Sequence, residues 1–207
     1  MRRALTLAIV LFWLVMVGLL VHKQAPPPSA PQAPLAAGTT PERDEWFGVA
    51  QYLAPAPFIE SADAAIVATA RSIVGSGRDA TAAARALVAW VNEHLEQAPS
   101  VTISSAHEVL AARRGDCNEH AVLLAALAGA AGIPARVVGG AMYLGGAFYY
   151  HAWTELWLGT WVSADAVFRQ LPTDATHVKL LEGGPERHME LAGIVGELRF
   201  TAEESER

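Results

Sequence analysis

The 207-residue chain is poor in cysteine, and its only one is Cys117. A single thiol excludes a disulfide within the chain, so an apolar core has to hold the fold together. Hydrophobic residues make up 52% of the sequence, enough to supply such a core. A lone cysteine is most often a small buried hydrophobic residue, so only its surroundings can indicate a different role for Cys117.

Charge is also scarce. Only 17% of the residues are charged, and the formal net charge is -6. Beyond the N-terminus, the basic residues cluster only at Arg113-Arg114. Proteins that bind nucleic acid meet its phosphates with grouped Lys and Arg, so we expect no nucleic-acid partner.

The N-terminal segment contains the longest stretch without charge. Arg2 and Arg3 precede an uncharged apolar run from Ala4 to Val21, which as a helix would span about 27 Å, close to the thickness of a bilayer core. We predict a signal anchor over residues 1–23, in preference to a cleaved signal peptide. The arginines favour a cytoplasmic N-terminus and a domain on the periplasmic or extracellular side.

Proline crowds the stretch that follows, residues 24–41. Such a segment favours extended polyproline geometry and predicts a semi-rigid linker of up to about 50 Å. We expect the folded domain to cover residues 42–182, with its core at 80–182. Residues 183–207 would form a tail or short closing elements.

Helical patterns come first in this domain. Candidates cover residues 42–52, 62–74 and 79–97, and Ser105 to Glu108 fits a capping box that opens a short helix. Asp116 to Glu119 fits a second box, and the helix after it is apolar nearly all round, as expected for a helix in the domain centre. Gly132 and Pro134 end it.

Strand patterns follow the helices. We predict strands over residues 136–144, 147–158 and 161–167, with turns at Gly145-Gly146 and Gly159-Thr160, and short strands near 178–181 and 198–201. Helices followed by an antiparallel meander define an α+β fold.

Cys117 is predicted at the first position of the buried helix. A helix N-terminus carries partial positive charge and free N–H groups, which favour a thiolate and can bind an oxyanion. The negative charge of Asp116 opposes the thiolate, so a nearby base is needed, and imidazole is the usual partner of a catalytic thiol. The chain has seven histidines, and each taken singly is more often structural. We expect His177 in a loop or at a strand edge and His188 in a charged tail.

Three blocks resemble the transglutaminase-like superfamily. They are Gly115 to Ala121 with the helix exit Gly132 to Arg136, Tyr150 to Glu155, and Trp161 to Asp165; together the resemblance covers about residues 80–182. It implies a papain-like arrangement in which Cys117 attacks an amide carbonyl, His151 carries the proton and Asp165 orients His151. The implied substrate is a peptide or protein amide, with no cofactor.

The turn at Gly159 tests this assignment. A strict two-residue loop would pair Asp165 with Thr154 and turn its side chain away from His151. An odd loop, such as Leu158-Gly159-Thr160, pairs Asp165 with Trp153 and brings Asp165 diagonal to His151 on one face. We therefore predict an odd loop or a bulge.

Alternatives stay open. The thioester could pass to water, as in a peptidase or amidase, or to an amine, as in an acyltransferase. The domain could also be a non-catalytic binding or scaffolding module. A metal site would combine Cys117, His120, His151 and Asp165, but a second ligand pair at metal spacing is missing. Trp153 and Trp157 share a face with His151, where core packing is favoured over substrate binding.

Overall fold

The computed structural model describes residues 48–191 except 78, 101 and 189. The predicted anchor at 1–23, the linker at 24–41 and the strand near 198–201 therefore lie outside the described residues. No helix in the described ranges is long and apolar enough to cross a membrane.

Six helical elements are present in this part of the chain, and their caps follow the sequence. Asp79 caps α4 by accepting from the backbone N–H groups of Thr81 and Ala82, and Ser105 and Glu108 form the predicted capping box of α5. The bounds are η1 (Ala50–Leu53), α3 (Ala64–Val74), α4 (Ala80–His94), α5 (Ala106–Ala112), α6 (Cys117–Ala130) and α7 (Pro185–His188).

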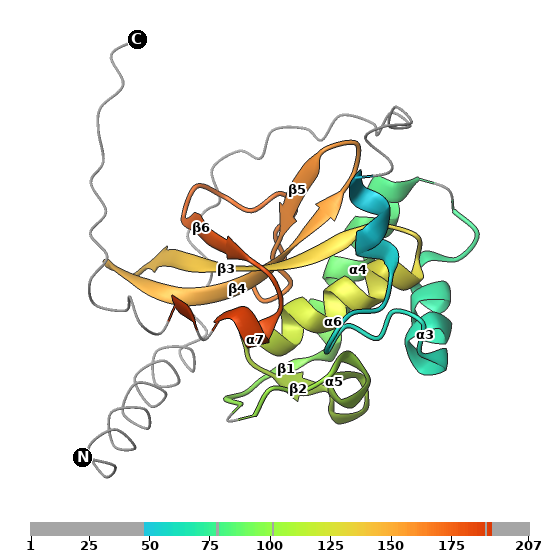
Figure 1. The fold of residues 1–207 in the computed structure, drawn as a ribbon, viewed down its shortest axis with the longest axis horizontal. Helices are drawn as coiled ribbons and strands as arrows, with labels where there is room; N and C mark the ends of the chain where they lie inside the picture. Colours follow the sequence, from blue (N-terminus) through green and yellow to red (C-terminus); the bar gives the residue numbers. More distant parts are fainter. Residues whose placement is uncertain (1–47, 78, 101, 189, 192–207) are drawn as a thin grey trace.

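Helix α6 is the centre of the molecule. It lies between the sheet and helices α3, α4 and α5, so its side chains are buried on nearly every face (Figure 1). This position explains why its sequence is apolar all round. The helix ends where expected, since Gly132 adopts a positive φ of 82° directly after it.

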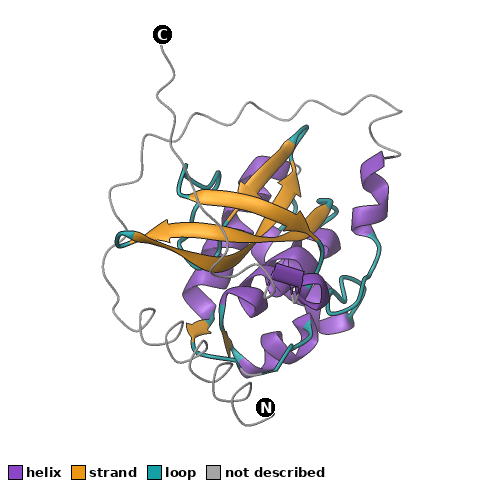
Figure 2. Ribbon diagram, turned by 60° about the vertical axis from the view of Figure 1, so that its left-hand side comes forward, coloured by secondary structure: helices purple, strands orange, loops and turns teal. Residues whose placement is uncertain are grey.

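The main sheet has four strands in the order β5-β4-β3-β6, which Figure 1 labels and Figure 2 shows in orange. Strands β3, β4 and β5 form the predicted antiparallel meander, whereas β6 returns to the opposite edge and pairs with β3. The bounds are β3 (Ala135–Leu144), β4 (Ala147–Trp157), β5 (Trp161–Ala164) and β6 (His177–Glu182).

The β4–β5 connection has the predicted odd length. Trp157 pairs with Trp161, which leaves a three-residue loop with Gly159 at a φ of 92°. In this register Thr154 pairs with Ala164, so the next residue of the chain, Asp165, comes opposite Trp153. The register prediction is confirmed.

A second, two-stranded sheet was not predicted. Strands β1 (Glu96–Gln97) and β2 (Arg114–Gly115) pair in parallel, closed by hydrogen bonds from the Glu96 N–H to the Arg113 carbonyl and from the Ala98 N–H to the Gly115 carbonyl. Two residues per strand are too few for a periodic pattern to be visible in sequence. The sheet fixes the segment that leads into Cys117.

Candidate active site

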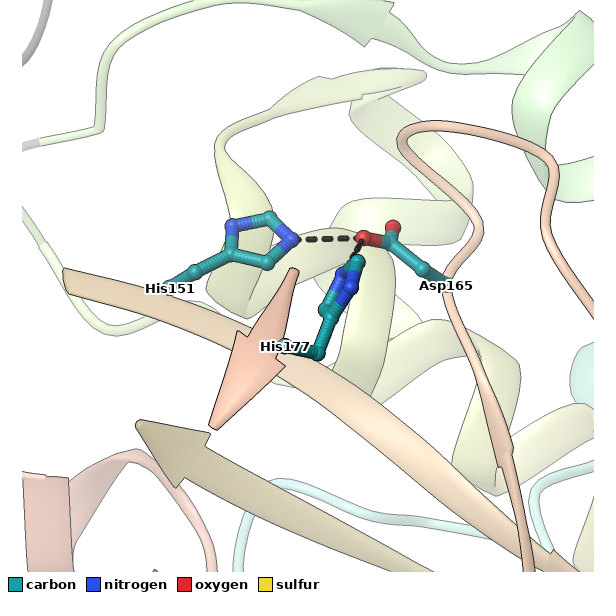
Figure 3. A group of neighbouring side chains, drawn as sticks. All are labelled: His151, Asp165 and His177. Atoms are coloured by element: carbon teal, nitrogen blue, oxygen red, sulfur yellow. Dashed lines mark hydrogen bonds and ion pairs between the residues drawn. The ribbon is translucent and has the colours of Figure 1, made fainter. Parts of the chain in front are cut away.

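His151 and Asp165 are in direct contact. The Nε2 atom of His151, in the middle of β4, lies 2.7 Å from Oδ2 of Asp165, just after β5, and both side chains are buried (Figure 3). Because Nε2 faces the carboxylate, Nδ1 of the same ring is left to face another group. The structure thus brings together two of the three predicted site residues as an acceptor carboxylate and a base.

Asp165 is held by more than His151. Its Oδ1 accepts from the backbone N–H groups of Val167 (2.7 Å) and Phe168 (3.3 Å), and its Oδ2 also accepts from Nε2 of His177 at 3.0 Å. Burial alone would raise the pKa of Asp165, but the neighbouring His151 and the hydrogen bonds of both histidines lower it below its usual range. The carboxylate therefore stays ionised in the interior.

Cys117 is the first residue of α6, as predicted. Asp116 is its N-cap and accepts from the Asn118 N–H at 2.8 Å, while the Glu119 carboxylate accepts from the Asp116 N–H at 2.9 Å. Helix α6 packs against β4, and the backbone N–H of Ala152, the residue after His151, faces the thiol and favours its ionised form. The thiol therefore lies against the strand that carries His151.

The environment of the thiol differs from one expectation. A helix N-terminus was expected to lower the pKa of Cys117, but burial, followed by the charge of Asp116, raises it well above its ordinary value. Cys117 is only 5% exposed, so the loss of hydration outweighs the partial charge of the helix end. Cys117 therefore needs a base that removes its proton.

The capping carboxylates beside Cys117 form a buried pair. Burial, followed by the neighbouring Glu119, raises the pKa of Asp116 to about 8. A neutral Asp116 at physiological pH would spare Cys117 a nearby negative charge. His120 turns toward its own helix, since its Nδ1 lies 2.7 Å from the Asp116 carbonyl oxygen, and burial lowers its pKa.

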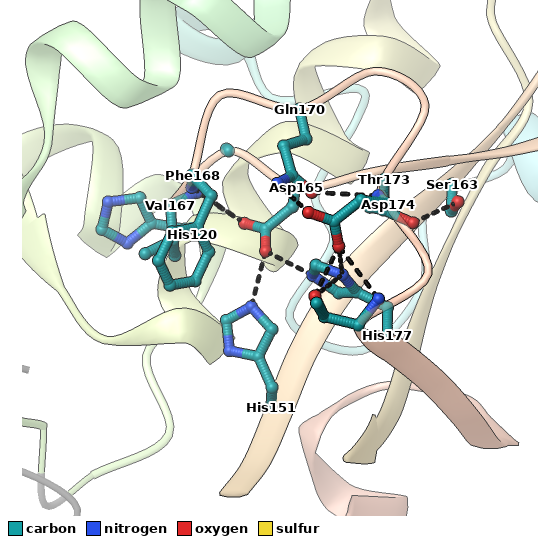
Figure 4. A network of polar contacts seen from close by, with 12 residues as sticks. His120, His151, Ser163, Asp165, Val167, Phe168, Gln170, Thr173, Asp174 and His177 are labelled. Atoms are coloured by element: carbon teal, nitrogen blue, oxygen red, sulfur yellow. Dashed lines mark hydrogen bonds and ion pairs between the residues drawn. The ribbon is translucent and has the colours of Figure 1, made fainter. Parts of the chain in front are cut away.

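The histidine beside Asp165 was missed from sequence. His177 is the first residue of β6, 12 positions after Asp165, and was expected only in a loop or at a strand edge. Figure 4 shows it between two carboxylates, with Nε2 toward Asp165 and Nδ1 3.4 Å from Oδ1 of Asp174. The Gly139-Gly140 pair inside β3 was a usable signal, because glycines in a strand mark a close approach of another chain segment.

A second polar cluster also brings distant residues together. The Tyr150 hydroxyl donates to Oδ1 of Asn118 at 2.8 Å and lies 2.7 Å from Nδ1 of His188 in α7. His188 was expected in a charged tail, yet it is buried, and burial lowers its pKa to about 4. The cluster therefore links Asn118, which follows Cys117, to Tyr150, which precedes His151.

Among the described residues, three or more His, Cys, Asp or Glu side chains that could hold a metal ion come together in one place. Potential ligand atoms of His151, Asp165 and His177 all lie within 4.8 Å of one another, whereas the set considered from sequence combined Cys117 and His120 with His151 and Asp165. The Nε2 atoms of both histidines point at the same oxygen of Asp165, as hydrogen-bond donors do. Metal ligands would instead be arranged around a common centre between them.

Two other residues on the His151 face make packing and ion-pair contacts. Trp153 is buried against both site histidines, with ring centroids 6.1 Å from His151 and 5.2 Å from His177. Glu155 lies 2.7 Å from the Arg136 guanidinium and 2.9 Å from the Lys179 ammonium, so it links β4 to β3 and β6. These contacts are those of packing and ion pairing between neighbouring strands.

The comparisons with known proteins agree with this geometry. Residues 67–166 match the family model of the transglutaminase-like superfamily. The fold is also similar to that of a candidate cysteine protease from Cytophaga hutchinsonii, with a TM-score of 0.62 and 26% identity over 71% of this chain. This chain spans 50% of that protein's length.

A second solved structure has lower similarity. The periplasmic domain of TgpA from Pseudomonas aeruginosa, bound to ethylmercury, has a TM-score of 0.47 and 25% identity, covering 57% of this chain and 48% of that one. No curated protein matches the sequence. The fold and the family match define a transglutaminase-like core of mixed helix and antiparallel sheet. This core, residues 67–166, is the part of the chain that matches the transglutaminase-like superfamily.

Proposed function

We propose that this protein is a cysteine enzyme that transfers acyl groups from amide bonds of peptides or proteins through a thioester on Cys117. The observation that carries the proposal is the 2.7 Å contact between His151 Nε2 and Asp165, which leaves Nδ1 for the thiol. The placement of Cys117 at the start of α6, against the strand of His151, supports it.

The reaction follows from these positions. Nδ1 of His151 takes the Sγ proton of Cys117 as the sulfur attacks the amide carbonyl carbon, and the carbonyl oxygen becomes an oxyanion. The backbone N–H of Cys117, the first residue of α6, can bind that oxyanion, whereas the N–H groups of Asn118 and Glu119 already donate to the Asp116 side chain. The imidazolium, stabilised by Asp165, then gives its proton to the leaving amine, and a Cys117 thioester remains.

The raised pKa of Cys117 specifies the role of His151. A thiol that is neutral at pH 7 attacks slowly unless its proton moves to a base during the attack. His151 is therefore a general base in this mechanism, and its removal should abolish reactivity.

The acyl acceptor decides the reaction class. Water that reaches the thioester gives hydrolysis, and an amine gives transamidation. Hydrolysis is our default, because water outcompetes amines unless the protein binds an acceptor. The similarity to a candidate cysteine protease supports the same default.

A non-catalytic binding domain is the second candidate. The observation that favours it is the burial of Cys117, which is 5% exposed and whose thiol has a raised pKa. A core cysteine without a catalytic role would have the same environment. In that case Cys117→Ala would leave the protein's biological activity unchanged.

Incubation with activated esters and with a peptide library, read by mass spectrometry, tests the proposal. We expect an acyl adduct on Cys117 and released products in the native chain, with neither in Cys117→Ala. Added primary amines should appear in the products only if the enzyme is an acyltransferase. Products that form equally in Cys117→Ala would contradict the thioester mechanism.

We also propose that residues 1–23 anchor the domain in a membrane with the site on the extracytoplasmic side. The support is the uncharged run Ala4 to Val21 preceded by Arg2 and Arg3. Membrane fractions that keep the full chain after alkaline carbonate extraction would agree with the anchor. Release of the chain by carbonate would contradict it.

A further inference from the structure

We propose that His177 is a positioning residue that orients the Asp165 carboxylate toward His151. This inference rests on the proposed function, because it assigns a role in the same site. His177 would act on the reaction through Asp165 and not by contact with the substrate.

The first support is the sharing of one oxygen. His177 Nε2 lies 3.0 Å from the same Oδ2 that His151 contacts at 2.7 Å, and the two carboxylate-bound rings are separated by 5.6 Å between centroids. The His177 side chain is 2% exposed, so water does not compete for this bond. Without His177, Oδ2 would keep only its contact with His151, while Oδ1 would still accept from the Val167 and Phe168 N–H groups.

The orientation of His177 is fixed on its other side. Its Nδ1 lies 3.4 Å from Oδ1 of Asp174, and Asp174 is itself held by Gln170 through both its carboxylate and its backbone N–H (Figure 4). Although burial opposes ionisation, hydrogen bonds from Thr176 lower the pKa of Asp174. A carboxylate on this side favours the ring orientation that directs Nε2 at Asp165.

The backbone also brings β6 close enough. Gly140 in β3 pairs with His151 on one side and with Lys179 on the other, next to a register shift at Gly139/Gly140. A Cβ at position 140 would lie 2.1 Å from the Val178 carbonyl oxygen and 2.8 Å from the Trp153 ring. Only glycine allows this approach, which places His177 beside the site.

Two substitutions separate hydrogen bonding from packing. His177→Phe keeps a ring but removes both nitrogens, and His177→Gln can place an amide N–H where Nε2 now donates to Asp165. His94→Gln, an exposed histidine at the end of α4, is the matched control. Proton NMR of the His151 Nε2–H and the rate of Cys117 alkylation are both measured in each variant.

We expect His177→Phe to shift or broaden the His151 Nε2–H resonance and to slow alkylation at least 10-fold. His177→Gln should restore the resonance and most of the rate, and His94→Gln should change neither. In the Asp165→Asn background, His177→Phe should add less than a twofold loss, since residues that act through one another are not additive.

An unchanged His151 resonance in His177→Phe overturns the inference, and so does a full additional loss in the Asp165→Asn background. Failure of the proposed function gives a different result: alkylation of the native chain would then be insensitive to His151→Ala. The NMR result still decides the positioning role in that case, because it does not depend on catalysis.

Discussion

His151 Nε2 lies 2.7 Å from Asp165 Oδ2, although the two residues belong to consecutive antiparallel segments whose side chains alternate between faces. The contact depends on the three-residue loop between Trp157 and Trp161. An even loop would turn Asp165 to the far face and separate the base from its carboxylate. The local geometry of one turn thus sets the chemistry that the site can perform.

Asp165→Asn should weaken the base. The amide keeps the shape but loses the charge that stabilises an imidazolium, so we expect alkylation of Cys117 at pH 7 to fall on the order of 100-fold.

The same substitution should also change the stability of the fold. Because folding lowers the pKa of Asp165, the native chain gains stability above the unfolded pKa near 4 and loses it as the pH falls.

Thermal unfolding of both proteins between pH 7 and pH 3 checks this. The native chain should be more stable at pH 7, by about 2 kcal/mol, and the difference should shrink below about pH 4. A stability gap that stays constant over this range would show that Asp165 is not the ionised, hydrogen-bonded group described here.

Asp116→Asn should have the opposite pH dependence. Folding raises the pKa of Asp116 to about 8, so the folded chain retains a proton that the unfolded chain releases, and the native protein loses stability as the pH rises from about 4 to about 8. Asn keeps the cap without titrating. The melting temperature of the variant relative to the native chain should therefore climb over this window and level off above it.

Alkylation gives a second readout of Asp116. Above pH 8 the charge of Asp116 opposes the thiolate, so Asp116→Asn should react faster than the native chain there and similarly at pH 6. Asp79→Asn changes the exposed cap of α4 and serves as the control. Equal alkylation rates for Asp116→Asn and the native chain at pH 9 would exclude this effect.

Gly140→Ala tests the close approach of β6. The added methyl would overlap the Val178 carbonyl, so we expect a loss of about 1–3 kcal/mol in unfolding free energy. Gly77→Ala, where a Cβ would meet nothing nearer than 3.5 Å, should have a much smaller effect. Denaturant unfolding measures both. Equal stability of the two variants would show that β3 and β6 have more room than the structure allows.

Much of this site could be predicted because its signals are local. Capping residues mark the start of α6 at Cys117, and the glycine turn sets the register that joins His151 to Asp165. Side-chain alternation carries that information across two neighbouring strands without knowledge of the rest of the fold.

The role of His177 could not be predicted in this way. It depends on β6 crossing to the far edge of the sheet and on the close passage over Gly140, and neither leaves a periodic pattern. The raised pKa of Cys117 was missed for a similar reason. A helix N-terminus is visible in sequence, whereas the degree of burial comes from the packing of α6 against β4.

The rate of Cys117 alkylation across pH, compared between the native chain and His151→Ala, tests the central claim most directly. Our account predicts that Cys117 reacts well below pH 8 in the native chain, and that His151→Ala removes this reactivity while the protein stays folded. Slow alkylation with the same pH dependence in both proteins would contradict a thiol activated by His151.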